Sequence, residues 1–115
     1  MMSTEATLIH HLQSLKQGVD AILSDYAHDS VLFTAEGPIR GLDGIRAFFA
    51  GFLNSSPPEL LDALTLVRQD IDGDVAYIIW KAEPFISLAT DTFVIRSGKI
   101  RVQTFTMLPP PVATE

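Results

Sequence analysis

The stretch TDTFVIRSGKIRVQTF, Thr90 to Phe105, predicts two strands folded back on each other. Ser97 and Gly98 fit a two-residue hairpin turn, because glycine tolerates the positive φ that such turns require. Side chains alternate between the two faces of a strand, so this turn fixes which residues share a face. The pairs expected on one face are Ile95 with Ile100, Phe93 with Val102, and Asp91 with Thr104. This predicted face is apolar and carries one carboxylate, that of Asp91.

The length of 115 residues predicts a single domain, residues 1–115, whose core needs no disulfide or metal. A hydrophobic fraction of 47% excludes general disorder, and no apolar run approaches the roughly 20 residues that span a bilayer. The sequence has no cysteine, which excludes disulfides, thiolate nucleophiles and cysteine metal sites. The formal net charge of −6 argues against binding to nucleic acid or to anionic membranes. The first residues show no signal peptide, so the expected location is the cytoplasm.

The segment from Thr4 to Tyr26 repeats apolar residues at spacings of three and four, which define one face of a helix. Gly18 interrupts this pattern, so two successive helices are expected within residues 4–26. His11 falls at the edge of the apolar stripe and is expected to touch the interior, whereas His10 points away from it.

A further helix is predicted near residues 42–54, where Ile45, Phe48, Phe49 and Phe52 repeat at i, i+3, i+4 and i+7. Its aromatic stripe has two interpretations. The three phenylalanines pack against a sheet as ordinary core, or they wall a ligand pocket.

Five strands are predicted near residues 29–36, 59–71, 75–83, 86–96 and 99–108. The start of the segment 59–71 also suits a helix, but its second half, TLVRQDI, favours the strand interpretation. Helices followed by long strands predict an α+β fold, a curved antiparallel sheet wrapped over the helices as a cone with an open end. From about residue 109 the proline-rich end of the chain predicts a flexible tail.

Two passages carry a resemblance to a known family. They are ILSDYAHDSVLFTAEGPIRGLDGIRAFFAGF, Ile22 to Phe52, and DTFVIRSGKIRVQTF, Asp91 to Phe105. Both resemble the NTF2-like superfamily and, within it, the SnoaL-like and ketosteroid-isomerase-like small proteins, which share a cystatin-like α+β fold. The resemblance implies a cone-shaped sheet and homodimers formed sheet to sheet. It leaves function open, because this superfamily holds isomerases, cyclases, dehydratases and noncatalytic modules.

Compared with the ketosteroid isomerases, Asp91 falls where those enzymes place an aspartic acid that donates a hydrogen bond to the substrate oxyanion. His11 falls near the position of their oxyanion-hole tyrosine. Thr34 stands where their general-base aspartate would be, and threonine does not abstract a carbon-bound proton at neutral pH. The resemblance therefore does not extend to steroid isomerisation by that mechanism.

A carboxylate on an apolar strand face is costly unless it is hydrogen-bonded, paired or kept neutral. Asp91 is therefore either functional, with a pKa above the ordinary value of about 3.9, or structural, bonded to a backbone amide, Thr104 or an arginine. The predicted catalytic residues are Asp91 and His11. The predicted ligand-binding residues are Tyr26, Phe48, Phe49, Phe52, Trp80, Phe93 and Thr104.

No metal and no cofactor are predicted. His10 and His11 are neighbours on a helix and point about 100° apart, and no acidic residue stands one turn from either. The sequence has no glycine-rich phosphate loop and no G-x-S-x-G passage.

Two function classes remain. The first is an enzyme of isomerase, cyclase or dehydratase type that acts on a small, largely apolar ligand by acid or base catalysis. The second is a noncatalytic binding or dimerisation module of the same fold. A homodimer is expected through the outer face of the sheet, opposite Asp91, where Leu88, Val94, Phe105 and Met107 are predicted to lie.

Overall fold

The computed structural model describes residues 2–108, and the predicted tail from about residue 109 lies outside this part of the chain. Helices and strands follow one another in an order close to the predicted one. They are α1 (Thr4–Ser14), α2 (Val19–Leu23), β1 (Tyr26–Thr34), β2 (Gly37–Arg40), α3 (Gly41–Ser55), α4 (Glu59–Ala63), β3 (Thr65–Asp72), β4 (Val75–Ala82), β5 (Ile86–Arg96) and β6 (Lys99–Leu108). None of the helices within residues 2–108 is both long and apolar enough to cross a membrane.

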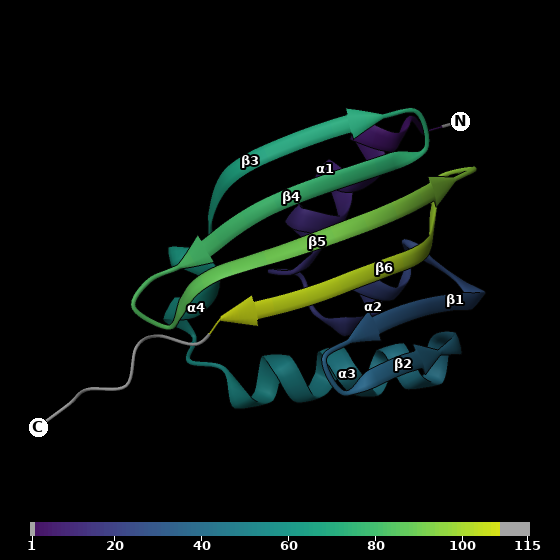
Figure 1. Ribbon diagram of the computed structural model, residues 1–115. Helices are drawn as coiled ribbons and strands as arrows, with labels where there is room; N and C mark the ends of the chain where they lie inside the picture. Colours follow the sequence, from purple (N-terminus) through teal and green to yellow (C-terminus); the bar gives the residue numbers. More distant parts are fainter. Residues whose placement is uncertain (1, 109–115) are drawn as a thin grey trace, which may run out of the picture.

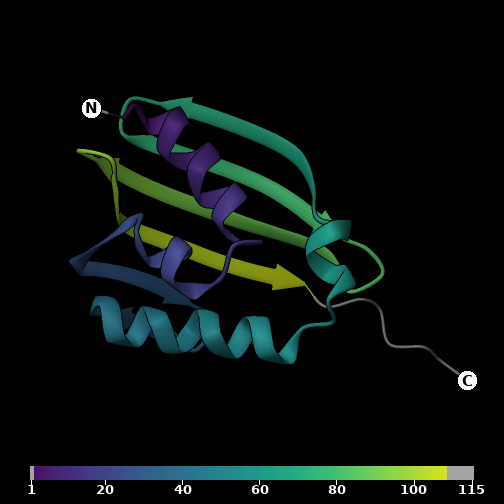
Figure 2. The ribbon, with the colours of Figure 1, turned by 180° about the vertical axis from the view of Figure 1, so that it is seen from behind.

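The strands form one six-stranded sheet in the order β2-β1-β6-β5-β4-β3. Helices α1, α2 and α4 lie over one face of it, as Figure 2 shows, and α3 runs beside β1 and β2. The opposite face of the sheet is turned toward the viewer in Figure 1. This arrangement confirms the predicted α+β class, in which a sheet packs one face against helices.

The sheet is mixed rather than wholly antiparallel, because β1 and β6 run parallel while the other neighbouring strands are antiparallel. The path of the chain between β1 and β6 explains why these two strands are parallel. After β2, α3 and α4 carry the chain to the far edge of the sheet, and the meander from β3 to β6 then returns it to the free side of β1. Long crossovers of this kind are what parallel neighbours require.

The N-terminal helices break where the sequence predicts. Ser3 caps α1 by accepting a hydrogen bond from the backbone N–H of Ala6 at 3.0 Å, and Gly18, with a φ of 101°, separates α1 from α2. The predicted helical range 4–26 is too long at its end. Tyr26 already begins β1, and Asp25 lies in the connection between α2 and β1.

The predicted strand 59–71 is partly wrong, since its first five residues form the short helix α4. Two prolines precede this helix and two carboxylates lie in its first turn, a composition that suits a helix N-terminus. Leu60 fixes α4 to the rest of the fold by lying buried in the core. The strand β2 was not predicted, and it extends the sheet by pairing with β1.

The hairpin of β5 and β6 has the predicted turn but a different register beyond it. Ser97 and Gly98 both have positive φ, and Ile95 lies opposite Ile100 as expected. A bulge then inserts Arg101 as an extra residue in β6. The observed pairs are Val94 with Val102, Phe93 with Gln103, Thr92 with Thr104, and Asp91 with Phe105.

This bulge corrects the predicted faces of four residues, which are Val102, Thr104, Phe105 and Met107. Gln103 and Phe105 share the inner face with Asp91, whereas Thr104 lies exposed on the outer face. Met107 pairs with Ala89 on the inner face. Of the four residues predicted for the outer face, Leu88 and Val94 do lie there, and Phe105 and Met107 do not. The physical reason is that side chains alternate along a strand, so the one extra residue moves every later residue of β6 to the opposite face. Arg101 itself forms an ion pair with Asp29 at 3.3 Å.

Candidate functional site

A pocket lies between the helices and the inner face of the sheet, with a cavity of about 50 Å³. Its wall is mostly apolar. The predicted site residues that line it are His11, Phe48, Phe49, Phe52, Trp80, Asp91 and Phe93. Gln103 and Phe105, which sequence reasoning did not place there, also line the pocket.

Asp91 lies in the middle of β5 with only 6% of its surface exposed. Its Oδ1 accepts a hydrogen bond from Trp80 Nε1 and its Oδ2 accepts one from Gln103 Nε2, both at 2.8 Å. Burial raises the pKa of Asp91 to about 6, although the two hydrogen bonds oppose this shift. Within residues 2–108 no cationic side chain forms an ion pair with Asp91. Asp91 is therefore a buried acid that titrates near neutral pH.

Gln103 connects Asp91 to Tyr26. The Tyr26 hydroxyl donates to Gln103 Oε1, so the Gln103 amide is oriented with its Nε2 toward Asp91. Tyr26 is buried behind the pocket wall rather than in it, and burial raises the pKa of its hydroxyl well above the ordinary value. The predicted role of Tyr26 as a ligand contact is thus replaced by a role in holding Gln103.

His11 projects from α1 into the same interior and is 3% exposed. Its ring packs edge-on against Tyr26, Phe49 and Phe93, with ring centres 5.7, 6.1 and 5.5 Å away. Burial first, and the charge of His10 second, lower the pKa of His11 to about 4. His11 is therefore a neutral imidazole at pH 7, next to the pocket that contains Asp91.

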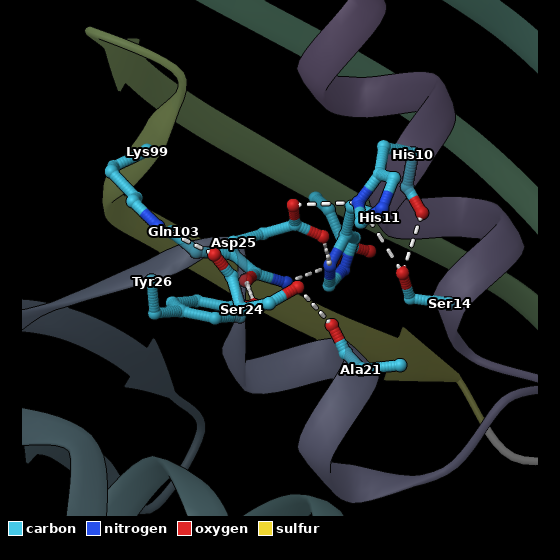
Figure 3. Close-up of polar contacts among 10 residues, drawn as sticks. His10, His11, Ser14, Ala21, Ser24, Asp25, Tyr26, Lys99 and Gln103 are labelled. Carbon is cyan, nitrogen blue, oxygen red and sulfur yellow. Dashed lines mark hydrogen bonds and ion pairs between the residues drawn. The ribbon is translucent and has the colours of Figure 1, made fainter.

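A second polar cluster joins α1 to the start of β1, as Figure 3 shows. His10 Nδ1 lies 2.7 Å from Asp25 Oδ1, and His11 Nδ1 lies 4.0 Å from Asp25 Oδ2, too far for a hydrogen bond. Both Asp25 Oδ2 and His11 Nδ1 are buried without a hydrogen-bond partner among the described residues. Burial raises the pKa of Asp25, which the hydrogen bond from His10 opposes. A proton on His11 Nδ1 would face Asp25 and leave Nε2 as a hydrogen-bond acceptor.

Asp91 and His11 make opposite contributions to stability over the same pH range. The folded-state pKa of Asp91 is raised, so its contribution is fully present below about 3.8 and is lost as the pH rises through about 6. The folded-state pKa of His11 is lowered, so its contribution is present above about 6.5 and is lost as the pH falls through about 4. The contributions of the two residues therefore partly cancel in the pH dependence of the free energy of unfolding.

Two residues singled out in the sequence lie away from the pocket. Thr104 was predicted to bind ligand, but its Oγ1 accepts a hydrogen bond from the Thr92 backbone on the outer face, so that prediction is wrong. Thr34 lies at the turn between β1 and β2 and donates to the carbonyl of Gly37. Among residues 2–108, no group of three or more His, Asp or Glu side chains could hold a metal ion.

The sequence gives only weak signals for Asp25 and Gln103, the residues of the site that it did not predict. Asp25 contacts His10 and His11 only because the chain between them folds back, which no periodicity shows. Gln103 enters the interior through the bulge at Arg101. The one available hint was Phe105, a large apolar residue that the unbulged register places on the outer face.

A six-stranded sheet that closes an apolar pocket over helices, with the buried acid Asp91 in the pocket wall, defines this chain as a small pocket-forming α+β protein. Comparison with solved structures shows which fold of that class it has. No family model matches the sequence, and the search of curated proteins finds no match.

Three solved structures illustrate the likeness. An NTF2-like protein of unknown function from Burkholderia xenovorans superposes with a TM-score of 0.75 at 17% identity, over 96% of this chain and 87% of that one. A SnoaL-like protein of unknown function from Burkholderia thailandensis gives 0.73 at 16% identity, over 91% and 93%. A proposed ketosteroid isomerase from Kribbella flavida gives 0.69 at 17% identity, over 97% and 80%. At these identities the likeness establishes the fold alone, and the fold is the NTF2-like one expected from the sequence.

The network around Asp91 predicts unequal effects for two neighbouring residues of β6. Gln103→Ala leaves the Tyr26 hydroxyl and Asp91 Oδ2 buried without partners, and should lower the free energy of unfolding by about 2–3 kcal/mol. Thr104→Ala removes one hydrogen bond at the surface and should cost less than about 1 kcal/mol. Urea unfolding at pH 7 measures both. Equal losses, or a larger loss for Thr104→Ala, would support the unbulged register instead.

Proposed function

We propose that this protein binds a small, largely apolar ligand in the pocket and that Asp91 acts on it as an acid or base. The observation that carries the proposal is a carboxyl group at the inner end of an apolar cavity, bonded to two neutral donors and to no cation within the described residues. Burying a carboxylate among apolar side chains costs free energy, and acidic residues in clefts whose pKa is shifted are concentrated at functional sites.

The chemistry follows from the pKa of Asp91. With a pKa of about 6 it is mostly a carboxylate at pH 7, yet it accepts a proton readily. A ligand with a carbonyl group could lose an adjacent carbon-bound proton to Asp91, so that the C–H electron pair moves into the enolate. The protonated acid would then return the proton at another position. Reactions of isomerase, cyclase and dehydratase type begin with such a transfer, and the neutral His11 is the nearby hydrogen-bonding partner.

A noncatalytic binding module of the same fold is the second candidate. It is favoured by the size of the cavity, since about 50 Å³ is well below the roughly 300 Å³ of a pocket for a drug-sized ligand. It is also consistent with Phe48 and Phe49, which pack edge-on at 5.3 Å and so serve the core as well as the pocket. The two candidates differ in whether Asp91 transfers a proton.

Cyclohexanone is a suitable probe for both binding and proton transfer. Trp80 is the single tryptophan of the chain and donates to Asp91, so its indole N–H resonance reports on the pocket directly. We expect cyclohexanone to shift this resonance, and we expect the wild-type protein to accelerate exchange of the probe's α-hydrogens in D₂O. Asp91→Asn should lower the exchange rate by about 100-fold or more.

The Asp91→Asn variant is expected to fold, because the hydrogen-bond network can reverse. The new amide can accept from Trp80 and donate to Gln103 Oε1, and Gln103 Nε2 can then donate to the Tyr26 hydroxyl. Asp72→Asn, at the exposed end of β3, makes the same change in charge and should alter nothing. Binding without exchange would favour the noncatalytic module, and no shift of the Trp80 resonance would reject the proposal.

We also propose a homodimer through the outer face of the sheet. Leu88, Val94, Val75 and Phe33 lie on this face, and all except Val94 are among the exposed large apolar residues. Exposed apolar residues grouped on one sheet face are typical of an interface. The NTF2-like fold resemblance implies the same arrangement.

Ile79 lies on the outer face in the middle of β4, and Ile71 lies on the opposite face near the end of β3. We expect light scattering at micromolar concentration to give a dimeric mass for the wild-type protein and a monomeric mass for Ile79→Lys. Ile71→Lys is the matched control and should remain dimeric. A monomeric wild-type protein would contradict the proposal, as would a crystal interface below roughly 1,000 Å² of total buried area.

A further inference from the structure

A second cavity adjoins the pocket. The inner cavity, of about 50 Å³, and an outer one, of about 150 Å³, share four lining residues, which are Leu12, Leu15, Leu61 and Leu64. Because the same side chains line both spaces, the two cavities adjoin each other, and together they are called the passage below. The inner end of the passage holds Asp91, and the outer end is bounded by Lys16 and Asp62.

The helices explain why four leucines line this passage. Leu12 and Leu15 are three residues apart at the end of α1, so they point to the same side of that helix. Leu61 and Leu64 have the same spacing at the end of α4. Figure 2 shows α4 beyond the C-terminal end of α1, over the same face of the sheet. Each helix thus contributes one pair of leucines to the wall.

The mouth of the passage has no net charge to select a ligand. Lys16 and Asp62 are both exposed and form an ion pair with each other at 3.2 Å. An exposed pair of this kind is weak and holds α4 to the end of α1 only loosely. The inner end is closed by buried rings, since His11 packs edge-on against Phe93 and Phe49 there. The adjoining outer cavity therefore gives a ligand longer than the inner cavity room to extend between α1 and α4.

From this geometry we infer that the ligand is elongated, with a polar head at Asp91 and a neutral alkyl tail that runs between α1 and α4 to the surface. The inference rests on the proposed ligand pocket and adds the class of ligand, an amphiphile with an acyl-like or alkyl chain. It also explains why the inner cavity is small, because this cavity needs to hold only the head of the molecule.

A series of 4-alkylcyclohexanones from methyl to hexyl tests the inference, with the Trp80 indole N–H resonance as the measure of affinity. Each methylene buried between the leucines should tighten binding about fourfold. The increase should stop once the chain passes Lys16 and Asp62, because further methylenes enter water. Intermolecular NOEs should join the terminal methyl group of the butyl compound to methyl groups of Leu12 and Leu61.

Leu61 lines both cavities, so the effect of Leu61→Phe is measured as a ratio: this variant should weaken the butyl ketone roughly tenfold more than it weakens unsubstituted cyclohexanone, because the larger ring takes up space that the tail needs. Leu66→Phe, at an exposed position of β3 outside both cavities, is the matched control. If Leu61→Phe does not fold, the NOEs in the wild-type protein decide. Binding of cyclohexanone with no gain from longer tails, and no NOEs to the leucines, would overturn the elongated ligand and leave the proposed pocket intact. Failure of cyclohexanone itself to bind would reject both.

Discussion

The buried carboxyl group of Asp91 is the constraint on which the interior of this protein depends. A carboxylate loses its hydration when it enters an apolar interior, and that loss must be offset by hydrogen bonds or by protonation. Here β4 supplies the indole N–H of Trp80 and β6 supplies the amide of Gln103, so three neighbouring strands meet at one acid. Tyr26 at the start of β1 orients that amide, which extends the network across most of the sheet.

The bulge in β6 makes this network possible. Without the extra residue Arg101, Gln103 and Phe105 would face away from Asp91. With it, Phe105 stacks on Trp80, with ring centres 6.2 Å apart, and also meets Phe48 of α3. The aromatic stripe of α3 therefore does two things at once. It packs the core, as the simpler interpretation of the sequence holds, and it walls the cavity that leads to Asp91.

The sequence predicts those features that arise from local chemistry. Positive φ at Ser97 and Gly98 sets the hairpin, the break at Gly18 separates the first two helices, and alternation places Asp91 on the inner face. It does not predict features that depend on distant partners. Arg101 bulges out toward Asp29, 72 residues away in sequence, and Asp25 is bound by a histidine 15 residues earlier. The sequence does not predict helix α4, because a strand-forming run follows it directly. For the same reason the sequence does not predict the mouth of the passage, which α4 helps to form.

The central claim is that Asp91 is a buried acid held by Trp80 and Gln103. The most direct test is an NMR pH titration that follows the Asp91 carboxyl carbon and the Trp80 indole N–H in the same sample. We expect one shared midpoint at about 6, because the indole donates directly to the titrating carboxyl group. A midpoint near the ordinary value of 3.8 for Asp91, with a Trp80 resonance that does not follow it, would contradict the account.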